Sequence, residues 1–65
     1  MAKTVYEYLT AEKESCERIA RRYQRDLEDG PSELITNHIR HYLDTAKALE
    51  LAAQNLPVEV AEKEI

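Results

Sequence analysis

The stretch EDGPSEL, residues 28–34, holds the only glycine of the 65-residue chain and one of its two prolines. The long segments on either side lack both residues and are rich in Ala, Leu, Glu, Lys and Arg, which favour helices. Gly30 can take the left-handed conformation that ends a helix, and Pro31 suits the first position of the next one. The stretch therefore predicts a tight turn at residues 29–31 between two helices. We expect these helices at residues 4–28 and 31–56.

The segment before the turn begins with a helix-start signal. Thr4 followed three residues later by Glu7 is the pattern of a capping box. The apolar positions that follow repeat at steps of three and four, with one polar interruption at Glu12, whereas a strand would alternate in twos. These apolar positions are Val5, Leu9, Cys16, Ile19, Tyr23 and Leu27.

The segment after the turn carries a wider apolar stripe. Its central positions are Ile35, Ile39, Tyr42, Ala46, Leu49, Ala53 and Leu56. At about 100° per residue they lie within roughly 100° of arc. Leu34 and His38 widen the stripe on one flank and Leu43 widens it on the other. A helix that is apolar over about half its surface needs more than one neighbouring helix.

These patterns predict an all-α protein, an antiparallel two-helix hairpin that forms a single domain over residues 1–65. A chain of this size is marginally stable alone, and its single cysteine cannot form an internal disulfide. We therefore expect the hairpin to complete a bundle by dimerisation or with a partner. Pro57 stops the second helix, and we expect the tail at 57–65 to be frayed, although it could be extended and dock on another surface.

Composition narrows the class of partner. A formal charge of −4 disfavours nucleic-acid binding, because such proteins usually show a basic surface. Trp and Phe, the usual stacking platforms for single strands, are absent. No apolar run is long enough to span a bilayer or to form the core of a signal peptide. We therefore expect no membrane association and a cytoplasmic location.

No residue pattern indicates catalysis, a metal site or a cofactor. His38 and His41 are three apart and could share a metal, but a site needs three or four ligands and no HExxH motif is present. Cys16 lies on the apolar seam without an activating base at a fixed spacing, so we expect it in the core. A thin hairpin offers no pocket for paired carboxylates. We expect a protein that is not an enzyme.

The remaining surface favours protein–protein interaction by helix-to-helix docking. Edge tyrosines are common interface anchors. Four arginines between residues 18 and 25 form the most basic surface, although Glu14 and Glu17 stand four residues before two of them, in the order that favours ion pairs. The expected partner-binding residues are Tyr8, Leu34, His38, Leu43, Arg21, Arg22 and Arg25.

Two local similarities to known families give more specific hypotheses. The stretch SELITNHIRHYL, residues 32–43, resembles the second helix of ribbon-helix-helix repressors, in which a serine caps the helix. That resemblance implies a DNA-binding transcriptional regulator whose strand enters the major groove. At the family's spacing the strand would fall near residues 9–13, which do not alternate. We keep this function as an alternative.

The segments RDLEDG, residues 25–30, and KALE, residues 47–50, resemble the small YscE-type co-chaperones of type III secretion needle subunits. Their separation here is about one helical turn longer than in that family. The resemblance implies a cytoplasmic hairpin that pairs with a larger helical-repeat chaperone and keeps a needle subunit from polymerising early. We therefore expect a co-chaperone or regulator. A small inhibitor of a host protein, of the kind that phages carry, is the other alternative.

Overall fold

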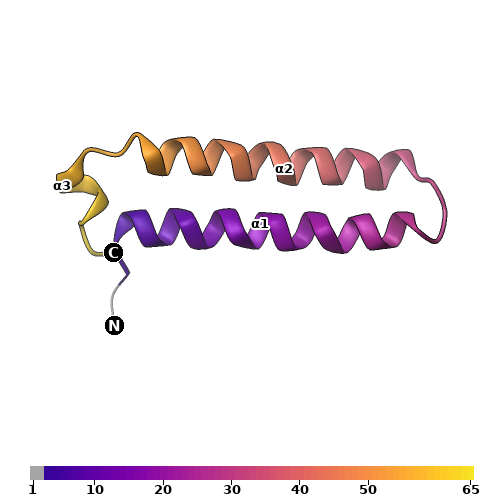
Figure 1. The fold of residues 1–65 in the computed structure, drawn as a ribbon, viewed down its shortest axis with the longest axis horizontal. Coiled ribbons are helices and arrows are strands. Elements are labelled where there is room, and N and C mark those ends of the chain that lie inside the picture. Colours follow the sequence, from indigo (N-terminus) through magenta and orange to yellow (C-terminus); the bar gives the residue numbers. More distant parts are fainter. Residues whose placement is uncertain (1–2) are drawn as a thin grey trace.

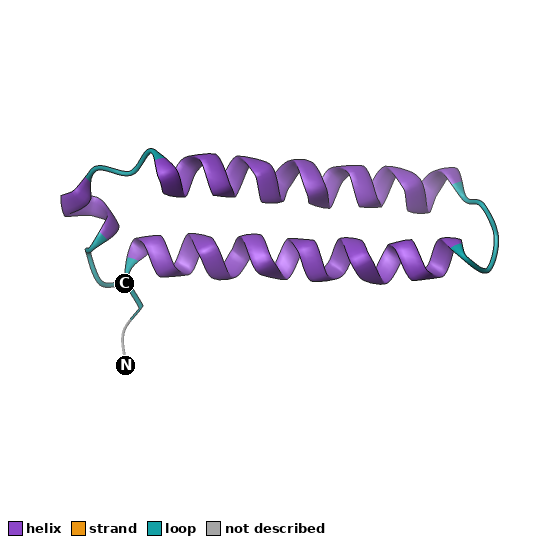
Figure 2. Cartoon of the chain, viewed as in Figure 1, coloured by secondary structure: helices purple, strands orange, loops and turns teal. Residues whose placement is uncertain are grey.

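The computed structural model describes residues 3–65 and shows an antiparallel pair of long helices (Figure 1). Helix α1 spans Val5–Leu27 and helix α2 spans Glu33–Gln54, and the two lie side by side along their length. A single turn of helix, α3 at Val58–Ala61, lies at the end opposite the turn. Within residues 3–65 there is no strand (Figure 2), so the all-α hairpin is confirmed.

Helix α1 starts at the capping box that the sequence predicts. Thr4 is the N-cap, its Oγ1 accepts a hydrogen bond from the Glu7 N–H at 3.1 Å, and the Thr4 N–H donates to Glu7 Oε1 at 3.2 Å. The helix ends at Leu27, with Glu28 as its C-cap. The predicted range of 4–28 therefore counts one cap residue at each end.

Helix α2 is shorter than predicted by two residues at each end. Ser32, with extended backbone at φ −143° and ψ 123°, is the N-cap, and its Oγ accepts from the Ile35 N–H at 3.3 Å. Pro31 therefore lies outside the helix, because a serine side chain can satisfy a free N–H group that glycine cannot. At the far end Leu56 precedes Pro57, a position that disfavours helical backbone.

The turn itself differs from the predicted left-handed glycine. Gly30 has φ of +156°, a value that L side chains rarely adopt, yet far from the left-handed helical value near +57°. Instead, α1 ends through bonds between residues three apart. The N–H groups of Glu28, Asp29 and Gly30 donate to the carbonyls of Arg25, Asp26 and Leu27 at 3.0, 3.3 and 3.1 Å.

The tail is not frayed, and that prediction is wrong. After α3 the chain returns to the start of α1, where the Val5 N–H donates to the Lys63 carbonyl at 2.8 Å. The Ile65 N–H donates to the Lys3 carbonyl at the same distance, and Thr4 and Glu64 form an antiparallel bridge. The first N–H groups of a helix lack partners inside it, so the tail supplies one to α1.

The interior is small. Within residues 3–65 the only fully buried residues are Ala20, Ala46 and Ala53, which are 1%, 4% and 8% exposed. Ala20 was not among the predicted seam positions. The side of α1 that contacts α2 is therefore centred on Ala20. Glu12, which was counted in the predicted seam, is exposed, and Ile19 is half-buried at the edge of the contact. The larger apolar residues of both stripes are only half-covered by the opposite helix.

Candidate interaction surfaces

The two helices leave two broad faces, one on either side of the plane that contains both helix axes. On one face Lys13 Nζ lies 4.0 Å from Glu50 Oε1. On the other the Tyr23 ring stacks on His38, with centroids 5.3 Å apart. Successive residues of a helix are rotated by about 100° about its axis, and this rotation places the two pairs on opposite sides of the line of buried alanines. We call the two surfaces the Lys13 face and the His38 face.

The His38 face has an aromatic cluster near the turn. Tyr23 stacks on both His38 and Tyr42, at 5.3 and 6.0 Å with interplanar angles of 17° and 21°. His41 meets the Tyr42 ring edge-on at 5.3 Å. All three stacked rings are half-buried, so the cluster joins α1 to α2 while one side of it remains open.

Apolar residues continue along the rest of the His38 face. Leu34 is 68% exposed at the turn end, and Tyr8 is 46% exposed near the tail end. Helical spacing places the half-buried Ile19 between them, and Leu49 lies near the seam, where it also lines a hollow of the Lys13 face. Of the predicted partner-binding residues, the structure thus brings Tyr8, Leu34 and His38 to one surface.

The Lys13 face carries charged side chains that pair within the chain. Lys13 lies 3.9 Å from Glu17 as well as 4.0 Å from Glu50. A shallow hollow beside this cluster is lined by Tyr6, Thr10, Lys13, Leu49, Glu50, Ala53 and Gln54. Leu43, 44% exposed, lies on this side of α2. The predicted contact residues therefore divide between two opposite faces, and one docked helix cannot touch both.

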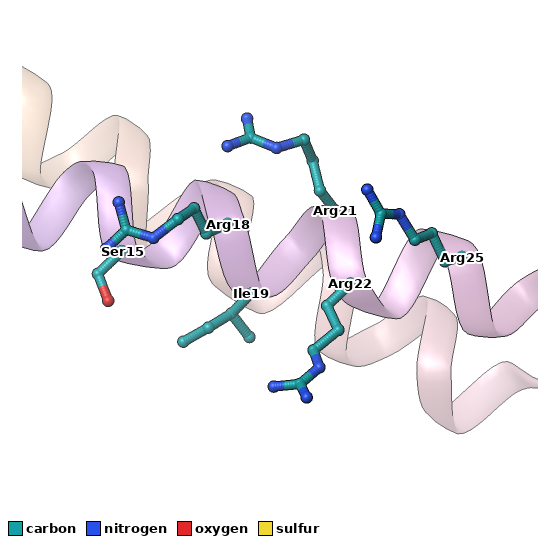
Figure 3. Close-up of a pocket in the computed structure, with 6 residues that line it drawn as sticks. All are labelled: Ser15, Arg18, Ile19, Arg21, Arg22 and Arg25. Carbon is teal, nitrogen blue, oxygen red and sulfur yellow. The ribbon is translucent and has the colours of Figure 1, made fainter.

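The four arginines occupy the outer side of α1, away from α2. Figure 3 shows Arg21 and Arg25 pointing one way, and Arg22 pointing the other way together with Ile19. Ser15, Ile19 and the four arginines line a shallow hollow. Arg22 is thus the arginine that borders the His38 face, whereas Arg21 and Arg25 point away from it.

None of these four arginines has an ion pair within 4.0 Å inside residues 3–65. The expected pairs of Glu14 with Arg18 and of Glu17 with Arg21 are not formed, and Glu17 lies beside Lys13 instead. An exposed pair contributes only about 0–1 kcal/mol, which is too little to fix two long side chains. The arginine cluster is therefore free to meet an acidic group from outside.

The possible metal ligands of the described part of the chain do not form a cluster. Among residues 3–65 no group of three or more His, Cys, Asp or Glu side chains is placed to hold a metal ion. Cys16 is a free, half-buried thiol in the seam of α1. No helix of that part is long and apolar enough to cross a bilayer.

The structure also bears on the ribbon-helix-helix resemblance. Ser32 does cap α2, as in ribbon-helix-helix proteins, but residues 9–13, where that family's strand would fall, are inside α1. Comparison of the chain with protein-family models, with curated proteins and with solved structures gives no match.

Proposed function

We propose that this chain is a non-enzymatic, cytoplasmic protein–protein interaction module, which docks helix against helix through its His38 face as a co-chaperone or regulator. One observation carries the proposal. The hairpin fully buries only three alanines within residues 3–65, while larger apolar side chains stay partly exposed. Tyr6 and Leu43 do so on the Lys13 face, and Tyr8 and Leu34 do so on the His38 face, beside its aromatic cluster. Covering apolar surface contributes about 25 cal/mol per Å², so a second layer of helices would stabilise this face.

Docking would use features at three points along the face. Leu34 and Tyr8 are exposed apolar anchors near its two ends, and the Tyr23–His38 stack lies between these two anchors. Anchors of this kind, surrounded by less critical contacts, dominate helix-in-groove recognition. The four unpaired arginines of α1 would speed association with an acidic partner.

The co-chaperone form of the proposal is supported by the resemblance of residues 25–30 and 47–50 to YscE-type proteins and by the hairpin shape that this family implies. The DNA-binding alternative loses support, because its strand would have to form where α1 is helical. The inhibitor alternative uses the same face and differs only in the identity of the partner.

A matched pair of substitutions on α2 tests the docking face. Leu34 and Leu43 are both exposed leucines, on the His38 face and the Lys13 face respectively. We expect Leu34→Glu to reduce capture of the partner from the native cell at least tenfold, because it places a charge in an apolar contact. Leu43→Glu should leave capture unchanged. The readout is quantitative mass spectrometry of affinity-purified material, with circular dichroism to establish that both variants are folded.

Equal capture by both variants would reject the His38 face as the docking surface. Selective loss with Leu43→Glu would move the docking surface to the Lys13 face.

A further inference from the structure

We infer that the occupant of the His38 face is a second copy of this chain, packed with its turn pointing in the opposite direction. The two copies would be related by a two-fold axis that lies between them, at right angles to the helices. In this arrangement α1 lies on α1 and α2 lies on α2, which gives a four-helix bundle. This inference names the partner that docks on the His38 face, and it rests on the proposed function.

The first argument is a self-complementary row of side chains on α1. Steps of four and three place six residues along its His38-face edge, symmetric about residue 17. They are Tyr8, Glu12, Ser15, Ile19, Arg22 and Asp26. An antiparallel copy therefore sets Glu12 against Arg22 of the second copy, and Tyr8 against its Asp26. Glu12 and Arg22 are both exposed, and neither has an ion pair within residues 3–65.

The second argument is a matching row on α2, symmetric about residue 45. Its members inside the helix are His38, His41, Thr45, Leu49 and Ala52, whereas position 56, the counterpart of Leu34, lies beyond the end of α2 at Gln54. The antiparallel copy sets the large ring of His38 against the small Ala52, and His41 against Leu49. Thr45 faces its own counterpart on the axis. The His38 ring thus meets a small side chain, which gives it room when the two helices pack closely.

The third argument is that one axis serves both rows. The Lys13–Glu50 ion pair and the stacks of Tyr23 on His38 and Tyr42 fix how α1 is aligned with α2. They place residue 17 of α1 level with residues 44–48 of α2. The two centres of symmetry, at 17 and 45, therefore lie at the same height along the hairpin.

Charge decides against the other symmetric arrangement, in which the two turns lie together and α1 packs on α2. There Glu12 would fall beside Ala52 and Arg22 beside His41, so neither charge would gain a partner. The extent of the surface is also sufficient. The hairpin extends 47 by 23 Å, so its broad face is of the size that a standard interface of roughly 800 Å² per partner needs.

A charge exchange tests the arrangement. We expect Glu12→Arg and Arg22→Glu each to raise the dimer dissociation constant about tenfold, because symmetry repeats every altered contact twice. The double variant should return to within about threefold of the natural chain. Residues ten apart are separated by about 15 Å along a helix, so this restoration cannot occur within one chain. The readout is sedimentation equilibrium over a range of concentrations.

Glu14→Arg and Arg18→Glu are the matched controls, since they make the same charge changes at exposed positions on the outer side of α1. They should leave the dissociation constant unchanged. A chain that stays monomeric at every concentration would overturn the second-copy inference, while the comparison of Leu34→Glu with Leu43→Glu would still decide the proposed function. A dimer whose double variant is no tighter than the single variants would overturn the antiparallel arrangement.

A cross-link at the axis gives an independent readout. In a Cys16→Ala background, Thr45→Cys should be joined into a covalent dimer by a short bismaleimide, because the two copies of residue 45 face each other. Thr36→Cys, on the Lys13-face side of the same helix, is the control and should remain monomeric. Failure of Thr45→Cys to cross-link, or equal cross-linking at both positions, would overturn the placement of the axis.

Discussion

The hairpin closes differently at its two ends. At the turn, every hydrogen bond that ends α1 joins residues three apart, between Arg25 and Gly30, and Ser32 then caps α2 over the same short distance. At the other end, the start of α1 is held by Lys63 and Ile65, which lie nearly the whole chain away in sequence. The turn is thus a local structure, whereas the closed end exists only once the helices have paired.

Deleting residues 57–65 should have the largest effect, because it removes the closed end and leaves the turn intact. The deletion removes the two 2.8 Å backbone hydrogen bonds and the contacts of α3 with α1. We expect the free energy of unfolding to fall by about 2–3 kcal/mol, since each bond contributes about 0.5–1.5 kcal/mol and apolar contact is lost as well. Urea denaturation at a fixed chain concentration measures it.

Ile65→Ala is the control for this deletion, because the Ile65 side chain is 67% exposed while its backbone makes the bond. It should change stability by less than about 0.5 kcal/mol. A deletion as mild as Ile65→Ala would show that the closed end contributes nothing to stability.

At the turn, the sharpest test is Gly30→Ala. A Cβ at this position would meet no atom within 4 Å, so any cost comes from the backbone, whose φ is +156°. We expect a loss of about 1–2 kcal/mol in urea denaturation. D-alanine introduced at position 30 by chemical synthesis favours positive φ and should be tolerated. Equal effects of the two enantiomers would contradict a backbone origin.

The smallest expected difference is between the two helix caps. Thr4 exchanges reciprocal hydrogen bonds with Glu7, whereas Ser32 makes a single side-chain bond of 3.3 Å. We expect Thr4→Ala to cost about 1–1.5 kcal/mol and Ser32→Ala about 0.5–1 kcal/mol. Thr4→Ser and Ser32→Thr keep the hydroxyl and should each recover most of the loss. A larger effect at Ser32 than at Thr4 would reverse this ranking.

The same contrast explains what the sequence can predict. The capping box at Thr4 and the turn at Gly30 and Pro31 depend on neighbours within a few residues, so both were placed within one or two positions. The closed tail was missed because its partners are far apart and meet through backbone atoms, which carry no residue signature. Ala20 was missed because a small residue adds little to a hydrophobic pattern, although it has the least exposed surface of the described residues.

For the candidate surface, the sequence identifies the residues on each flank of the apolar stripes, but it does not tell which flanks of the two helices lie on the same face. It places Leu34 and His38 on one flank of the second helix and Leu43 on the other. Which flank continues onto Tyr8 of the first helix depends on how the two helices are rotated against each other. That rotation became visible only from the Tyr23–His38 stack and the Lys13–Glu50 pair.

The three buried alanines have a consequence for how such a chain can change during evolution. Close packing restricts side-chain size at these three positions, whereas the other positions of the apolar stripes need only some apolar residue. Most positions can then drift without loss of the hairpin, whereas any growth at Ala20, Ala46 or Ala53 would push the helices apart. Distant descendants of this chain would therefore keep these three small residues and little else that is visible in an alignment.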